Sequence, residues 1–167
     1  LQVGEIKKRE GSAVFRPERE AQVIDGLKAD NRGPLPNECV APIWREIMSA
    51  CLALEVPQRV AVLGPEGTFT EQAAVEFFGS AANLIYCNSF DEVFHATAAG
   101  TSQFGVVGME NSTEGVVARS FDLFLHSPVH VVGAFNWDAG QPLKIDYPMD
   151  KLGLDKAVSY VGFDFWA

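Results

Sequence analysis

The chain has little positive charge and no long apolar stretch. Among its 167 residues, 13 lysines and arginines stand against 22 aspartates and glutamates, a formal net charge of −9 at pH 7. Binding to a phosphate backbone needs a concentrated basic surface, so we expect no nucleic-acid partner. No apolar run approaches the ~18 residues of a transmembrane helix, and the start, LQVGEIKKRE, lacks the apolar core of a signal peptide. We therefore expect no membrane partner.

Cysteine and histidine are also scarce. The three cysteines, Cys39, Cys51 and Cys87, lie within apolar patterns and show no C-x-x-C spacing. The three histidines likewise show no spacing typical of metal ligands, such as H-x-x-x-H. We predict buried, reduced thiols in a cytoplasmic protein, and we expect neither a metal nor a cofactor.

The composition is that of a folded protein, because 47% of the residues are hydrophobic and 21% are charged. Residues 1–55 have a helical pattern throughout. It predicts the end of a first helix before Gly11, a second helix over about 16–29 and a third over about 36–55. In the third helix, apolar residues recur at the i, i+3, i+4 spacing of one helix face. These residues are Val40, Ile43, Trp44, Ile47, Met48, Cys51 and Leu52.

Two glutamates lie on the apolar faces of these helices. Glu20 comes shortly before the apolar positions of the second helix, and Glu55 extends the apolar face of the third. Glu20 is also a first-turn acid favoured by the helix dipole, and Glu55 could equally belong to a frayed helix end. If both point inward, they require a polar pocket, for which Lys7, Arg16 and Arg19 supply the opposite charge.

After residue 58 the pattern changes to short apolar runs that alternate with helical segments. This alternation predicts a parallel sheet with crossover helices. The predicted strands are 59–64, 84–87, 104–109 and 129–133, and the predicted helices lie near 70–78, 89–99 and 115–126. Segment 134–167 alternates with period two and is rich in turns, so we predict antiparallel strands there. The fold class is thus α/β, with an all-α segment before the sheet and an antiparallel β tail after it.

The first predicted strand leads into the loop LGPEGTFTEQAA. Thr68 and Glu71 form the T-x-x-E pattern of a capping box, which accounts for Thr68 as a helix N-cap. The same geometry is typical of an anion site, because Gly67 lets the backbone approach a ligand and free N–H groups point at a carboxylate. The pattern by itself leaves both interpretations open.

A second polar loop, GMENSTEG, follows the predicted strand that ends near residue 109. Its consecutive polar residues are Glu110, Asn111, Ser112 and Thr113. Ligands in open α/β sheets bind beyond the carboxyl ends of strands, and both loops follow strands of the same predicted sheet. We therefore expect both loops at one sheet edge, as either capped helix starts or the walls of a shared crevice.

These stretches carry a resemblance to known families. LGPEGTFTEQAA, followed by MENSTEGVV, resembles the first half of a prephenate dehydratase domain. VGEIKKREGSAVFRPEREAQVI, NRGPLP and IWREIMSACLALE together resemble a chorismate mutase domain of the all-helical class. The two in this order are similar to the bifunctional chorismate mutase–prephenate dehydratases of bacterial phenylalanine synthesis. The resemblance extends over roughly residues 1–133.

The mutase resemblance implies roles for five residues. Lys7 matches the family lysine that contacts the ether oxygen and a carboxylate of chorismate. Glu20 matches the acid that binds the substrate hydroxyl, with Arg16 and Arg19 beside it. Glu55 matches the donor to the ether oxygen, and a glutamate donates there only while protonated. We therefore predict a mutase activity that falls as pH rises, unless the pocket keeps this glutamate protonated.

The dehydratase resemblance implies loss of water and carbon dioxide from prephenate, in a cleft between two lobes like those of periplasmic binding proteins. Residues of both polar loops match positions that line this cleft and bind carboxylate and hydroxyl groups. These residues are Gly67, Thr68, Thr70, Asn111, Ser112 and Thr113, with Glu110 beside them.

The resemblance also has gaps. The chain lacks the arginines of the mutase's first helix, the Thr-Arg-Phe motif of the dehydratase and the second lobe. Segment 134–167 departs from the family and faintly resembles the C-terminal β-sandwich of some glycoside hydrolases. Three hypotheses follow: an enzyme of this bifunctional type, a module that binds a small carboxylate without turnover, or a chimeric scaffold. Because an open sheet edge and intertwined mutase helices both favour pairing between chains, we expect a homodimer or larger oligomer.

Overall fold

The computed structural model describes residues 17–111, 115–136 and 162–164. None of the helices in these ranges is long and apolar enough to cross a membrane. The chain divides into two compact units, and each is described by itself. Unit 1 comprises Leu1–Gln58 and Val75–Asn83, and unit 2 comprises Arg59–Ala74 and Leu84–Ala167.

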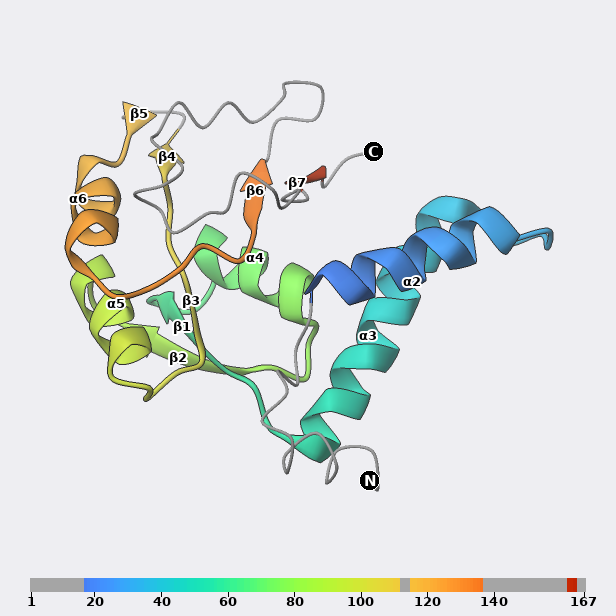
Figure 1. The fold of residues 1–167 in the computed structure, drawn as a ribbon, viewed down its shortest axis with the longest axis horizontal. Coiled ribbons are helices and arrows are strands. Elements are labelled where there is room, and N and C mark those ends of the chain that lie inside the picture. Colours follow the sequence, from blue (N-terminus) through green and yellow to red (C-terminus); the bar gives the residue numbers. More distant parts are fainter. Residues whose placement is uncertain (1–16, 112–114, 137–161, 165–167) are drawn as a thin grey trace. The chain divides into compact units, whose positions relative to one another are not determined.

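Unit 1 is built around two helices, α2 (Pro17–Asp30) and α3 (Asn37–Glu55), which pack against each other (Figure 1). Ile24 of α2 and Val40 of α3 are buried. In the turn between them, Asn31 Nδ2 donates to the Leu35 carbonyl at 2.7 Å. The expected helical N-terminal segment is therefore confirmed for the described residues.

α3 buries only part of the face that its apolar spacing predicts, Val40 being the buried member of that set. Ile43, Ile47 and Leu54 are 47%, 45% and 78% exposed, whereas Ser49 is buried. Cys51, on the exposed side, is itself exposed, which corrects the prediction that all three cysteines are buried. The reason is that small side chains on the other face of α3 permit a closer approach than the larger apolar ones.

The close approach to α3 occurs at the turn that follows α4 (Phe69–Phe78). This turn belongs to unit 1. Gly79 has φ +80°, and a Cβ added there would lie 2.3 Å from Ser49 Cβ. The Ser80 amide donates to Glu46 Oε1 at 3.0 Å, and the Ser80 hydroxyl donates to Glu46 Oε2. Only glycine fits both the backbone conformation and the space, so this turn is fitted to the side of α3.

Unit 2 contains a three-stranded sheet in the order β2 (Asn83–Cys87), β1 (Arg59–Leu63), β3 (Phe104–Val106). β1 and β3 are parallel, with Val60 opposite Phe104. Val60, Ala61 and Val62 are fully buried, as befits the central strand of a covered sheet. The pairing of β1 with β3 confirms the expected parallel sheet.

Two helices cover part of this sheet. Helix α5 (Phe90–Ala98) packs on β1 and β3, and its Val93 joins Ala61 and Cys87 in the core. Helix α6 (Ala118–His126) lies beside α5 (Figure 1). The rings of Phe94 and Phe124 pack edge to face, with their centroids 4.8 Å apart. The order of strands and helices is thus as the sequence predicts, apart from the C-terminal region.

Two predictions near α6 are wrong. The expected helix over 115–126 begins at Ala118, because β5 (Gly115–Val116) pairs antiparallel with β4 (Glu110–Asn111). The valine-rich run 129–133 forms no strand. Its sequence favours a strand, but a strand also needs a partner with which to exchange backbone hydrogen bonds.

The segment expected to form antiparallel strands also needs a correction. Its described strands, β6 (Ala134–Asn136) and β7 (Gly162–Asp164), pair in parallel, with Phe135 opposite Phe163. Period-two alternation predicts strands but not their direction. A hairpin would set an antiparallel direction, but these strands are far apart in the sequence. The rest of this segment lies outside the described residues.

Candidate functional site

The register of the sheet places the two polar loops at one edge. β1 ends at Leu63 and β3 ends at Val106, and the two strands are neighbours that run in the same direction. The first loop leaves β1 and the second follows β3, so both begin at the carboxyl edge of the sheet. This is the edge at which the sequence predicted them, and where ligands bind in open α/β sheets.

In the first loop, two threonine hydroxyls turn back to the end of β1. Thr68 Oγ1 donates to the Leu63 carbonyl at 2.8 Å, and Thr70 Oγ1 donates to the same oxygen at 3.1 Å. Thr70 is buried and Thr68 is half-buried. A hydroxyl has one hydrogen, so a threonine that donates to Leu63 offers a ligand only its lone pairs.

The same loop contains a complete capping box. The Glu71 amide lies 3.4 Å from Thr68 Oγ1, and the Gly67 amide donates to Glu71 Oε2 at 2.5 Å. Gly67 has φ +87°, a conformation that glycine adopts without strain. The helix-cap interpretation is therefore realised, and one N–H group of the loop, that of Gly67, is bound to the chain's own carboxylate.

The surroundings of this loop are acidic. Tyr86, on β2, is 44% exposed, and its pKa is raised by partial desolvation and then by the negative charges of Glu71 and Glu66. Phe69, the first residue of α4, is 78% exposed. A ligand carboxylate would meet repulsion here from two glutamates, whereas a neutral hydroxyl or an apolar ring would not.

Residues 107–109 connect the end of β3 to β4 (Glu110–Asn111), with which the second polar loop begins. Glu110 is exposed, and its β4 strand pairs with β5 through Glu110 opposite Val116 and Asn111 opposite Gly115. Ser112 and Thr113 lie outside the described residues. The base of the loop is closed by the Val117 amide, which donates to the Met109 carbonyl at 2.9 Å.

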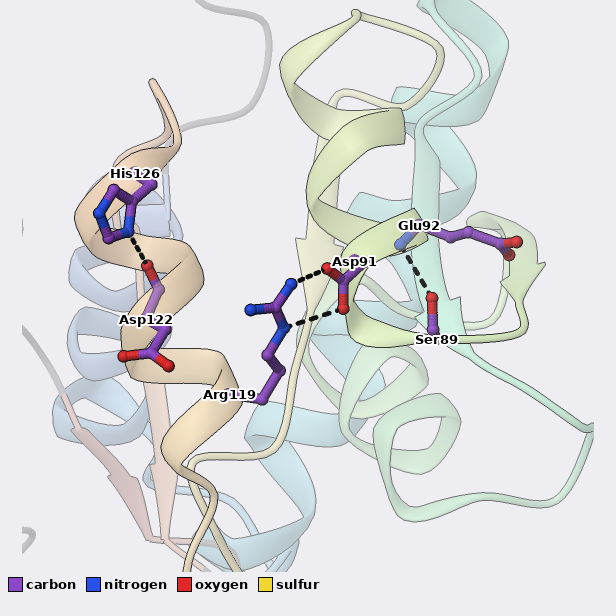
Figure 2. A network of polar contacts seen from close by, with 6 residues as sticks. All are labelled: Ser89, Asp91, Glu92, Arg119, Asp122 and His126. Carbon is purple, nitrogen blue, oxygen red and sulfur yellow. Dashed lines mark hydrogen bonds and ion pairs between the residues drawn. The ribbon is translucent and has the colours of Figure 1, made fainter.

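Helix α6, which follows this loop, is bound to the start of α5. Figure 2 shows Arg119 of α6 pointing at Asp91 of α5; Arg119 Nε donates to Asp91 Oδ2 at 3.1 Å, and Nη2 donates to Oδ1. The hydrogen bond from Arg119 lowers the pKa of Asp91 below its usual value. At the end of α6, His126 Nδ1 lies 2.8 Å from the Asp122 carbonyl oxygen. These contacts stabilise the outer pair of helices.

The proposed mutase residues are only partly within the described structure. Arg19 is exposed and donates to Gln22 Oε1 at 3.3 Å. Glu20 is half-buried, and burial raises its pKa to about 7, although the nearby Arg45 opposes the shift. Glu55 is the last residue of α3 and is half-buried. Lys7 and Arg16, like Ser112 and Thr113, lie outside the described residues.

Comparison with known families identifies the chain. A family model for prephenate dehydratase matches residues 60–149. The chain belongs to the prephenate dehydratase family. A second model, for chorismate mutase type II, matches residues 1–56. The dehydratase match runs to residue 149, beyond Gly133, where the sequence resemblance was expected to end.

Curated relatives join the same two activities in one chain. The bifunctional chorismate mutase/prephenate dehydratase of Pseudomonas aeruginosa is 52% identical over 124 residues, which is 74% of this chain and 34% of that protein. The protein of the same name from Neisseria gonorrhoeae is 44% identical over 131 residues, 78% of this chain and 36% of that protein. This member of the dehydratase family thus spans about a third of the length of these relatives.

Among solved structures, prephenate dehydratase from Streptococcus mutans is similar, with 32% identity and a TM-score of 0.45. The alignment covers 48% of this chain and 43% of that chain. Within the described part of this dehydratase-family chain, no three His, Cys, Asp or Glu residues gather as a metal site.

Sequence reasoning missed one charged partner. It offered Lys7, Arg16 and Arg19 as counter-charges for Glu20, but the described structure brings Arg45 of α3 close to it. Burial lowers the pKa of Arg45, and the charge of Glu20 is the largest influence that opposes this shift. No spacing signal in the sequence could have found it, because Glu20 is on another helix and the packed face of α3, with Arg45 and Ser49, does not follow the apolar pattern.

Proposed function

We propose that this chain supplies one wall of a prephenate site, at which water and carbon dioxide are lost to give phenylpyruvate in phenylalanine biosynthesis. The observation that supports the proposal is that two polar loops follow the carboxyl ends of the neighbouring parallel strands β1 and β3, within the segment that the dehydratase family model matches. Both loops belong to unit 2, so the proposal depends on one compact body.

The two loops suit different groups of the substrate. Thr68 and Thr70 have lone pairs to offer once their hydrogens go to Leu63, so they suit a substrate hydroxyl that donates. Glu66 and Glu71 disfavour a carboxylate beside them. We assign the substrate carboxylates to Asn111, Ser112 and Thr113 of the second loop, because amide and hydroxyl groups have hydrogens to donate. Glu110, an exposed carboxylate at the base of this loop, suits a substrate hydroxyl. Gly67 shapes the first loop rather than binding the substrate through its amide.

The N-terminal segment supports a second activity, the rearrangement of chorismate to prephenate. The match of residues 1–56 to chorismate mutase type II favours it. Glu20, with a pKa near 7, is protonated or ionised according to pH, which suits an acid that binds a substrate hydroxyl. We propose Lys7, Arg16, Arg19 and Glu55 as the other substrate contacts.

Chain pairing belongs to the same proposal. The exposed apolar side chains of α3, among them Ile43, Ile47 and Leu54, favour a homodimer in which a second copy covers them. The bifunctional relatives and the free cysteines Cys39, Cys51 and Cys87 support a cytoplasmic enzyme.

The proposal is tested by mixing the purified chain with prephenate, measuring binding by calorimetry and following phenylpyruvate by absorbance. Asn111→Ala is expected to weaken prephenate binding about tenfold or more, because a hydrogen bond to a charged group is lost. Asn83→Ala is the matched control, because this exposed asparagine lies at the start of β2, away from the carboxyl edge.

The outcomes separate the hypotheses. Phenylpyruvate formation supports a dehydratase, and binding without turnover supports a module that holds the substrate carboxylate. If the chain does not bind prephenate, or if both asparagine variants bind it equally well, the proposed site is wrong. A parallel assay for loss of chorismate absorbance tests the mutase.

A further inference from the structure

The first turn of α6 holds the backbone that leads into the second loop. Ser120 is fully buried, with 0% of its surface exposed, and its hydroxyl donates to the Gly108 carbonyl at 2.6 Å. On the next residue, the Met109 carbonyl accepts a hydrogen bond from the Val117 amide at 2.9 Å. Two successive carbonyls before Glu110 are thus bound to residues at the start of α6.

The position of α6 is itself fixed. Arg119 pairs with Asp91 at the start of α5 (Figure 2). The ring of Phe124 packs edge to face on that of Phe94. Helix α5 in turn packs on β1 and β3. The hydrogen bond from α6 to the Gly108 carbonyl therefore holds the start of the second loop, through α6 and α5, against the sheet whose strand β1 leads into the first loop.

The backbone at Gly108 needs such a restraint. Glycine has the widest choice of backbone conformations, and a Cβ added at this position would meet only Phe90 Cζ, at 3.8 Å. Neither side-chain bulk nor a tight neighbour fixes the peptide there. The Ser120 hydroxyl supplies the missing restraint through the carbonyl.

We propose that Ser120 is a positioning residue of the prephenate site, and that it sets the direction in which Glu110 and Asn111 leave the sheet. Ser120 touches no substrate, because it is fully buried, and it acts through the Gly108 carbonyl. The inference rests on the proposed function, since the loop that it positions is the one assigned to the substrate carboxylates. A serine that merely allows close helix packing would have no such effect on the loop.

The test compares Ser120→Ala with Ser102→Ala in the full chain. Ser102 is also buried, at 1% exposure, and its hydroxyl lies 3.3 Å from Thr97 Oγ1, before β3 rather than after it. Both variants lose a buried hydroxyl of unit 2, so they control for general loss of stability. Hydrogen exchange of the amides at 115–117 and prephenate binding by calorimetry are the two measurements.

In Ser120→Ala, exchange of the Val117 amide and its neighbours is expected to speed up about tenfold, the size of one lost hydrogen bond. Prephenate binding is expected to weaken by a similar factor, whereas Ser102→Ala leaves both unchanged. Unchanged exchange at 115–117 in Ser120→Ala overturns the positioning role. So does faster exchange with unchanged prephenate affinity, because the loop would then move without affecting the site.

Failure of the proposed function gives a different result. If the wild-type chain binds no prephenate, that function is wrong, and with it the assignment of Ser120 to a prephenate site. The exchange data then still show whether Ser120 holds the loop. Should Ser120→Ala fail to fold, Ser120→Cys replaces the hydroxyl with a much weaker S–H donor, so exchange at 115–117 is expected to be faster than in wild type. A rate equal to wild type would contradict the proposal.

Discussion

Two helix starts in unit 2 are built from nearly the same four residues, Thr68-Phe-Thr-Glu71 and Ser89-Phe-Asp-Glu92. In both, the hydroxyl residue caps the helix and the glutamate returns to a backbone amide four residues before it. The Gly67 amide donates to Glu71 at 2.5 Å, and the Asn88 amide donates to Glu92 at 2.7 Å. The local chemistry of the cap is therefore the same in the two loops.

The difference lies in what the two inner residues contact. In the second start, Phe90 is half-buried and Asp91 binds Arg119 of α6. In the first, Phe69 is 78% exposed and Thr70 binds the end of β1. A capping box by itself therefore does not indicate whether a helix start binds a ligand. The first start is a candidate because it follows the carboxyl end of the central strand β1, where ligands bind in open α/β sheets.

Removal of the two cap hydroxyls should show the largest difference. Thr68 caps α4 and also donates to the Leu63 carbonyl, so Thr68→Ala loses two hydrogen bonds and about 2 kcal/mol of unfolding free energy. Ser89→Ala loses the cap alone, or about 1 kcal/mol. Urea denaturation of both variants measures this. Equal losses would mean that the contact with Leu63 adds nothing.

The residue before each cap gives a smaller contrast. Gly67 has φ +87°, and an added Cβ there meets nothing within 4 Å. Gly67→Ala is therefore destabilised only by the unfavourable backbone conformation of a non-glycine residue. We expect a loss of about 1 kcal/mol, or about 2–4 °C in Tm. Asn88→Ala should cost less than about 0.5 kcal/mol, because Asn88 is exposed and has negative φ. Thermal unfolding that ranks the two in the opposite order would contradict this.

Loss of the ion pair between Asp91, at the start of α5, and Arg119 should have the smallest effect on the stability of the fold. Arg119 lowers the pKa of Asp91, so the pair stabilises the fold fully above the ordinary pKa of aspartate, about 3.9, and this contribution is lost as pH falls through the lowered value. Asp91→Asn should therefore be slightly less stable than wild type at pH 7 and equally stable in strong acid. High salt should also reduce the difference, since both side chains are exposed. A difference in Tm that persists at low pH would rule out this explanation.

Much of the fold could be predicted from the sequence. Apolar runs that alternate with helical segments predict the parallel sheet, and the capping box at Thr68 and Glu71 predicts the start of α4. The packed face of α3 could not be predicted, because hydrophobic spacing selects Ile43 and Ile47, whereas the contact with Gly79 depends on the small size of Ser49. Close approach between small residues leaves no apolar pattern.

The candidate site was predictable in place but not in detail. Strand order and direction were enough to bring both loops to one sheet edge. That the Gly67 amide is taken by Glu71, and that two threonine hydroxyls share the Leu63 carbonyl, depends on side-chain geometry that spacing does not contain. Arg45 was missed for the same reason, since its partner Glu20 is on another helix.

The fit of Gly79 and Ser80 to α3 bears on how the two family segments can be recombined. Gly79 belongs to the segment matched by the dehydratase family, and Ser49 belongs to the segment matched by the mutase family. A cut at the short linker between the two matches would remove the partner of Glu46 and uncover Ser49. Exchange of either segment for one from a single-function relative therefore requires a glycine at the turn and a small residue on the helix, transferred together as a matched pair.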